Sequence, residues 1–176
     1  MGVIMTVFLG ALGSVLASLL IIYFLYNIRP KISISPLIAC SSKEKGDTTF
    51  KIKVINKTTR KVIDLKGELT LVKPINRPEG IGKSLTNIPL KTESLLELSE
   101  CGVSDEFSDF AFHFMTTCDL HKVWGDDAGE YLRFRIKASD SLSNHTCVFT
   151  KVYHNKSTCI VNGISSKGDT LEVAVY

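Results

Sequence analysis

Histidine, cysteine and serine side chains are the groups in this 176-residue chain that could act as a catalytic base or nucleophile. The four histidines stand in no recognisable nucleophile motif, and the sequence has no P-loop, no His-Glu-x-x-His and no glycine-rich dinucleotide turn. His113 alternates with phenylalanines over residues 110–114, which predicts a strand with this histidine on the face opposite the aromatic rings. We therefore expect a surface or interface histidine, and a protein that is not an enzyme.

Metal binding would need cysteines, histidines or carboxylates at close spacing. The five cysteines are dispersed, form no Cys-x-x-Cys pair and have no histidine at zinc-finger spacing. The acids of residues 126–130 follow Trp124 and Gly125 and are typical of a turn, so a metal site there would need carboxylates from elsewhere. The sequence predicts neither a metal nor a cofactor.

Basic side chains form the clearest pattern that could bind a ligand. Arg133, Arg135 and Lys137 share one face of a predicted strand, and Lys51 and Lys53 share one face of another. Together they predict an anion-facing surface, although the formal net charge is only +3. Such a surface suits anionic lipid, an acidic patch on a neighbouring subunit or nucleic acid, and an ordinary solvated sheet face is the alternative. We do not expect direct nucleic-acid binding, because no aromatic residues share the face of the charges.

Alternation of apolar and polar residues predicts the strands that carry these side chains. Residues 91–100 could form a strand or a short helix. Seven or more short strands separated by turns, with no convincing amphipathic helix between them, are typical of an Ig-like antiparallel β-sandwich. The clearest of these strands are residues 32–35, 50–54, 62–72, 110–115, 132–136, 147–153 and 170–175.

Residues 1–28 contain no Asp, Glu, Lys, Arg or His, and about 20 apolar residues suffice to cross the hydrocarbon core of a bilayer. A cleaved signal would have a basic n-region and a shorter apolar core, so we expect a retained transmembrane helix. The predicted fold is mainly β, with this single N-terminal helix (residues 1–28) followed by a cytosolic β-sandwich domain (residues 29–176).

The orientation follows from the basic residues beside the span. Arg29 and Lys31 come directly after it, with Lys43 and Lys45 further on, so the N terminus is expected outside and the domain in the cytoplasm, at the cell inner membrane. An odd, dispersed set of cysteines suits a reducing cytosol. Three Asn-x-Ser/Thr triplets would be glycosylation sites in the opposite topology.

Small residues recur along one side of the predicted span at intervals of about four residues. Such a stripe lets helices pack closely in lipid and predicts a homo-oligomer, in which the stripe packs against a neighbour or lines a pore. The alternative is that small residues are incidental in a single-pass anchor. In a pore the stripe hydroxyls would face the lumen, and Arg29 and Lys31 would favour anions at its cytosolic mouth. The stripe consists of Thr6, Gly10, Gly13, Ser14, Ala17 and Ser18.

The uncharged span, the Arg29-Pro30-Lys31 junction and a compact β-rich domain in a chain of this length resemble the small accessory membrane proteins of type VI-B CRISPR systems. These proteins accompany a large RNA-guided RNA-cutting effector. The resemblance implies a ring of identical subunits that forms a membrane pore and depolarises the membrane in antiviral defence, once the effector detects phage RNA. It does not extend to the Arg-x(4 to 6)-His ribonuclease motif proposed for such proteins, because nine residues separate Arg135 from His145.

A second functional class remains open on the sequence alone. In it the span is a passive tether, and the sandwich is a binding module that recruits a cytosolic partner or senses a small nucleotide. Replacement of Ser14 by leucine would separate the two, because a tether needs only apolar residues whereas a packed oligomer needs the small side chain.

Overall fold

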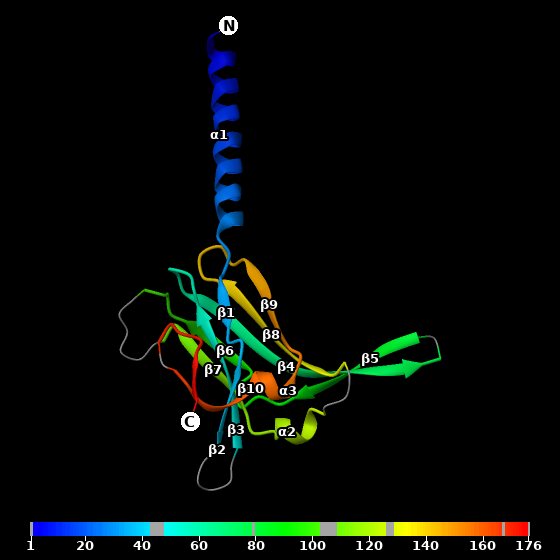
Figure 1. Ribbon diagram of the computed structural model, residues 1–176. Coiled ribbons are helices and arrows are strands. Elements are labelled where there is room, and N and C mark those ends of the chain that lie inside the picture. The colour runs from blue at the N-terminus through cyan, green and yellow to red at the C-terminus, as the bar shows by residue number, and fades with distance from the viewer. Residues whose placement is uncertain are drawn as a thin grey trace.

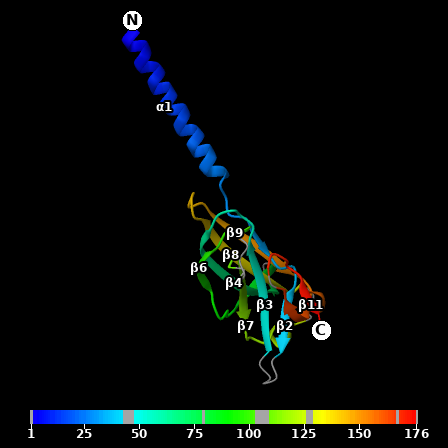
Figure 2. The same ribbon diagram turned by 90° about the vertical axis from the view of Figure 1, so that its left-hand side faces the viewer.

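The computed structural model describes residues 2–42, 48–78, 80–102, 109–125, 129–166 and 168–175. Its longest helix, α1 (Gly2–Asn27), extends away from a β-rich body (Figure 1, Figure 2). The stretch Gly2–Tyr26 is long and apolar enough to cross a membrane, which agrees with the predicted span. Lys43, Lys45 and residues 126–128 of the acidic cluster lie outside the described residues.

Strands dominate the rest of the described chain, with two one-turn helices between them. In chain order the elements are β1 (Ile32–Ile34), β2 (Ile38–Ser42), β3 (Thr48–Asn56), β4 (Val62–Arg77), β5 (Gly80–Ile88), β6 (Ser94–Leu98), β7 (Ala111–Thr116), α2 (Leu120–Val123), β8 (Tyr131–Asp140), β9 (Thr146–Tyr153), α3 (Lys156–Cys159), β10 (Ile160–Ser165) and β11 (Val173–Val175).

The strands form two sheets that pack face to face, so the mainly β fold with an N-terminal helix is confirmed. Sheet A has the order β1-β3-β2-β10-β11, with β7 also paired to β3, and sheet B has the order β5-β4-β8-β9, with β6 also paired to β4. Among the described strands, all the pairs are antiparallel except that between β10 and β2, in which Ile160 lies opposite Ile38. The arrangement is therefore a sandwich with one parallel contact.

Strand β4 organises sheet B because it has two partners in succession on one edge. Its first part pairs with β6 and its later part with β5, while β8 lies along the opposite edge. Beyond Val72 the paired strands β4 and β5 continue without β8, and this hairpin projects from the body (Figure 1). The segment between β5 and β6 leaves the edge of the sheet.

The core lies between the sheets and is built from the residues that the alternation predicts. Leu132, Phe134 and Ile136 of β8 are each fully buried, and Phe50 and Ile52 of β3 are almost so. Gly67 allows the close packing, because a Cβ atom there would lie 2.6 Å from the ring of Phe114. The core thus explains why the apolar positions of these strands alternate with polar ones.

Several strands were not predicted from the pattern. Strands β2, β5 and β10 contain Ser, Gly, Lys or Asn at positions where alternation would require apolar residues, and their pairing partners rather than their own sequences define them. Residues 91–100, left open between strand and helix, contain β6. The strand predicted over residues 170–175 is confined to β11.

Candidate membrane and ligand-binding sites

Helix α1 presents its apolar side chains outward along its whole length. Most of its large hydrophobic residues are exposed: Val3 and Ile4 are each 79% exposed and Tyr23 is 69% exposed. In its last turn, the Tyr26 ring contacts His145 of the sandwich. A 26-residue apolar helix that is exposed along most of its length needs lipid or other helices around it. The structure therefore contains a candidate single-pass membrane helix attached to a folded domain.

The small residues of the stripe all lie on exposed parts of α1. The Thr6 hydroxyl donates to the Gly2 carbonyl at 3.0 Å, and the Ser18 hydroxyl donates to the Ser14 carbonyl at 2.9 Å. These two hydroxyls therefore have hydrogen-bond partners within the helix and do not require a water-filled lumen. Ala17 lies beside them.

The two glycines of the stripe stand in open space. A Cβ atom added at Gly10 or Gly13 would meet no atom within 4 Å. Another helix could therefore approach the backbone closely at these positions.

The junction between α1 and β1 is ordered by contacts on both sides. The Ile28 amide donates to the carbonyls of Phe24 and Leu25, and the Ile28 carbonyl accepts a 2.7 Å hydrogen bond from the Ser143 hydroxyl. Ile28 and Pro30 are buried, whereas Arg29 and Lys31 are exposed. The junction consequently holds the helix to the sandwich rather than serving as a loose linker.

The two basic stripes do not form one surface. Arg133, Arg135 and Lys137 lie on the outer face of sheet B, whereas Lys51 belongs to β3 in sheet A. The outer faces of the two sheets of a sandwich point in opposite directions. The prediction that the two stripes form one combined cationic surface is therefore wrong.

Lys53 also departs from the expected solvent-facing position. It is 1% exposed, and its ammonium donates to the carbonyls of Ser166, Gly168 and Thr170, each at 2.7 Å. Burial lowers the pKa of Lys53, with the negative charge of Asp169 acting in the opposite direction. A segment from the far end of the chain thus covers this face of sheet A.

His113 lies opposite Lys53 in the β3–β7 pair and under the same covering segment. Its Nε2 atom is 3.0 Å from the Ser165 hydroxyl. Burial, together with the charges of Lys53 and Lys51, lowers the pKa of His113 to about 4. The ring is therefore neutral at physiological pH, and its position is that of a packed structural residue.

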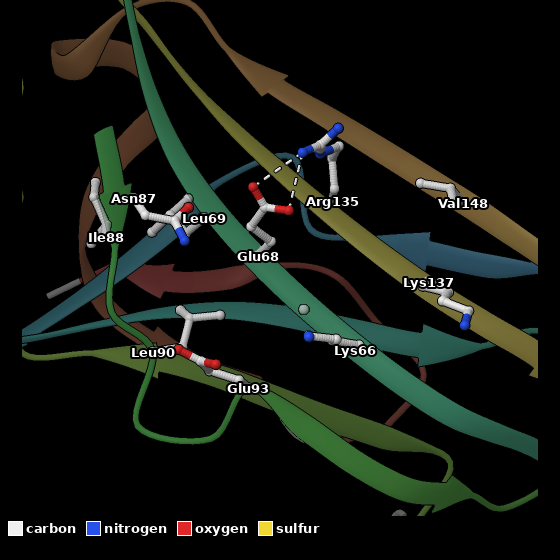
Figure 3. A pocket seen from close by; sticks show the side chains of 11 residues that line it. Lys66, Glu68, Leu69, Asn87, Ile88, Leu90, Glu93, Arg135, Lys137 and Val148 are labelled. Carbon is white, nitrogen blue, oxygen red and sulfur yellow. Dashed lines mark hydrogen bonds and ion pairs between the residues drawn. The ribbon is translucent and has the colours of Figure 1, made fainter. Parts of the chain in front are cut away.

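A hollow of about 430 Å³ opens on sheet B beside β4, where β5 ends and β6 has not yet begun. Buried Leu69, Ile88 and Leu90 supply its apolar floor. The hollow exists because the segment joining β5 to β6 leaves the sheet edge, although the Gly67 amide still bonds to the Glu93 carbonyl at 2.8 Å. Figure 3 shows these side chains around the opening.

Charged side chains frame the hollow. Glu68 accepts two 3.0 Å hydrogen bonds from one Arg135 nitrogen (Figure 3), and Lys66 and Lys137 are paired neighbours on β4 and β8. Burial alone would raise the pKa of Glu68, but hydrogen bonds from Arg135 and Thr70 outweigh it and lower the pKa. The carboxylate thus stays ionised, and the rim carries three cations and the two carboxylates of Glu68 and Glu93.

The sequence predicted Arg135 and Lys137 as part of a basic strand face, but it did not predict the hollow and missed Lys66, Glu68 and Glu93. Arg133 lies on the same outer face and acts on Glu68 through its charge. Only the β4–β8 register brings Lys66 beside Lys137, and no signal in either strand alone reveals it.

The described residues contain no group of three or more His, Cys, Asp or Glu that could hold a metal ion, and the five cysteines are free. The chain matches no known protein family and no curated protein.

Proposed function

We propose that this chain is a membrane-anchored binding module that recruits a cytosolic protein partner through the hollow of sheet B. The observation that carries the proposal is the hollow itself, with an apolar floor at Leu69 and Leu90 and a rim that includes Lys66, Lys137 and the Glu68–Arg135 pair. A concave apolar site with a few charged groups is the usual form of a ligand site.

The lining favours a peptide side chain over a nucleotide. None of the eleven lining residues is aromatic, so the hollow offers no ring on which a base could stack. Leu69, Ile88 and Leu90 suit an apolar side chain, and Lys66 and Lys137 suit an adjacent carboxylate. The preferred partner is therefore an acidic, partly apolar segment of another protein.

A cytoplasmic position at the inner membrane is part of the proposal. Its support is the location of Arg29 and Lys31 directly beside the candidate span, together with five free cysteines.

The proposal can be tested with the full-length protein in nanodiscs of neutral lipid. The probe is a dye-labelled peptide of alternating leucine and glutamate, and the measurement is fluorescence anisotropy. We expect saturable binding that is lost in the double variant Lys66→Glu/Lys137→Glu. The matched control is Lys83→Glu, which reverses an exposed cation on the projecting β4–β5 hairpin. Equal loss in the control, or no binding by the unmodified protein, would refute the assignment.

A second candidate is an oligomeric pore, favoured by the unobstructed approach to Gly10 and Gly13 along the stripe. In this function several copies of α1 pack through their small residues, and the assembly permeabilises the membrane. From the family resemblance, we also propose that such a pore is functionally coupled to an RNA-guided RNA-cutting effector in antiviral defence.

The pore candidate predicts a discrete large oligomer of the detergent-solubilised chain, measured as mass with the detergent contribution subtracted. Ser14→Leu should disrupt this oligomer and the leakage of dye from liposomes, whereas Leu16→Ile, on the same helix, should change neither. A monomer in the unmodified protein would remove this candidate and leave the binding module.

A further inference from the structure

Three segments gather at the end of the sandwich from which α1 emerges. They are the junction (residues 28–31), the β3–β4 turn (residues 57–61) and the β8–β9 turn (residues 141–145). The Lys57 amide donates to the Lys31 carbonyl at 2.8 Å, and the Ser141 amide donates to the Lys61 carbonyl at 3.2 Å. These three segments, called here the helix-proximal end, therefore form one continuous surface.

The length of α1 fixes the depth at which this end lies. Its 26 residues extend about 39 Å, compared with about 30 Å for the hydrocarbon core and about 40–45 Å including the headgroups. With its first residues at the far boundary of the bilayer, α1 reaches the near headgroup layer at its last turn. Because Ser143 hydrogen-bonds directly to Ile28, the β8–β9 turn lies at the same depth.

The β8–β9 turn exposes one apolar side chain, that of Leu142, which lies between two serines. Leu142 is 61% exposed, while its backbone amide is fixed by a 2.9 Å hydrogen bond to the buried Asp140 carboxylate. The turn therefore holds Leu142 in an outward position. A rigid turn with an exposed leucine beside a membrane helix has the form of an interfacial anchor.

Exposed cationic side chains lie at the same end of the sandwich as this leucine. Arg29, Lys31 and Lys61 are exposed at the helix-proximal end. Two carboxylates beside this end have cationic partners from it, since Arg60 pairs with Asp140 at 2.9 Å and Lys61 pairs with Glu97 at 3.1 Å. Arg29 and Lys31 thus give the surface a positive character that suits lipid phosphates.

An aromatic contact links the turn to the last turn of α1. The rings of Tyr26 and His145 are in edge-to-face contact, with centroids 6.1 Å apart, and the Arg29 guanidinium lies 4.3 Å from the Tyr26 ring centroid. Tyrosine is typical of the bilayer interface, where its ring and hydroxyl meet apolar and polar surroundings. The contact fixes the β8–β9 turn beside a residue of interfacial character.

From these contacts we infer that the helix-proximal end is a second membrane contact, separate from the span. Leu142 inserts at the boundary between headgroups and acyl chains, and Arg29 and Lys31 bind the phosphates of anionic lipids. The sandwich therefore has a fixed orientation on the bilayer surface. This contact does not depend on occupation of the hollow in sheet B.

Tryptophan fluorescence can test this contact, because Trp124 is the single native tryptophan and is 1% exposed. The full-length variant Leu142→Trp is reconstituted in vesicles of phosphatidylcholine and phosphatidylglycerol. Part of the phosphatidylcholine carries bromine near the carbonyl end of its acyl chains. We expect about twofold more quenching than in the unmodified protein. The control is Ile81→Trp, an 80% exposed position on the projecting hairpin, which should be quenched no more than the unmodified protein.

Two outcomes would overturn the inference. Quenching of Leu142→Trp no greater than that of Ile81→Trp would show that the turn does not reach the lipid. Equal quenching in vesicles of pure phosphatidylcholine, or in the added double variant Arg29→Gln/Lys31→Gln, would refute the role of anionic lipid. Quenching that requires phosphatidylglycerol and these two cations would support the whole inference.

Discussion

The buried Asp140 carboxylate should be a main source of stability at the helix-proximal end. Its side chain is 0% exposed. Oδ2 accepts a 3.0 Å hydrogen bond from Arg60 Nε, and Oδ1 accepts bonds from the amides of Leu142 and Ser143 at 2.9 and 3.1 Å. Asp140→Asn removes the charge but preserves the size of the side chain, so its effect reports the electrostatic part of these contacts.

The expected loss follows from the number and burial of these bonds. A hydrogen bond to a charged group contributes about 1.5–3 kcal/mol, and breaking a buried ion pair costs about 3–5 kcal/mol. The Arg60 side chain is 33% exposed and can regain water, while the asparagine can still accept from the turn amides. We therefore expect Asp140→Asn to lower the free energy of unfolding by about 3 kcal/mol.

Urea unfolding of the full-length protein in detergent, followed by Trp124 fluorescence, measures this loss. The control is Glu97→Gln, which breaks the exposed Lys61–Glu97 pair, whose side chains are 49% and 53% exposed. That change should cost less than about 1 kcal/mol. If the two variants lose equal stability, the reasoning from burial is refuted.

The pH dependence of this contribution has a defined sign. Burial by itself would raise the pKa of Asp140, but hydrogen bonds from Arg60, Ser143 and Leu142 outweigh it and lower the pKa. A lowered carboxyl pKa stabilises the fold above the ordinary value of about 3.9, and this stability is lost as the pH falls through the lower folded value. The difference in stability between Asp140→Asn and the unmodified protein should therefore shrink below about pH 4.

Three further predictions concern the covered face of sheet A and the core. Lys53→Met leaves three carbonyls without their buried donor, so amide hydrogen exchange over residues 168–172 should rise about tenfold or more while β8 stays protected. The folded pKa of His113 is about 4, below its ordinary value, so the neutral ring stabilises the fold fully only above about pH 6.5. This contribution to the free energy of unfolding should fall by about 2 kcal/mol between pH 6.5 and 4. His113→Gln should remove that slope in urea titrations across this range, and an unchanged slope would contradict the assignment. Gly67→Ala should destabilise the fold by about 1–3 kcal/mol in urea unfolding, because its Cβ would press on the Phe114 ring, and a neutral effect would mean that the ring yields freely.

The sequence was sufficient to predict elements whose own side chains alternate. Strand β8 has buried Leu132, Phe134 and Ile136 between half-buried or exposed basic residues, so period two was visible without any partner. Strand β5 contains two glycines, a lysine and an asparagine, and among the described strands it pairs only with β4. Its conformation depends on that partner, and a pattern within one segment cannot reveal it.

The site residues show the same division between local and long-range information. Alternation correctly placed Arg135 and Lys137 on one face of one strand, but it could not tell which sheet holds Lys51. Lys53 looked solvent-facing because its cover comes from a segment more than a hundred residues away. The hollow depends on β5 and β6 following each other along β4, which is a property of strand pairing rather than of any motif.

The parallel pair of β10 and β2 has a consequence for biosynthesis. Ile38 and Ile160 lie about 120 residues apart in the chain, yet they face each other in sheet A. During translation, α1 and β2 leave the ribosome long before β10 is made, so sheet A cannot close at that stage. Non-local pairing of this kind slows folding and leaves strand edges exposed meanwhile. A nascent chain held at the membrane by α1 would have the β10-facing edge of β2 unpaired until β10 is made. Its need for a chaperone would therefore be greatest between the synthesis of β2 and that of β10.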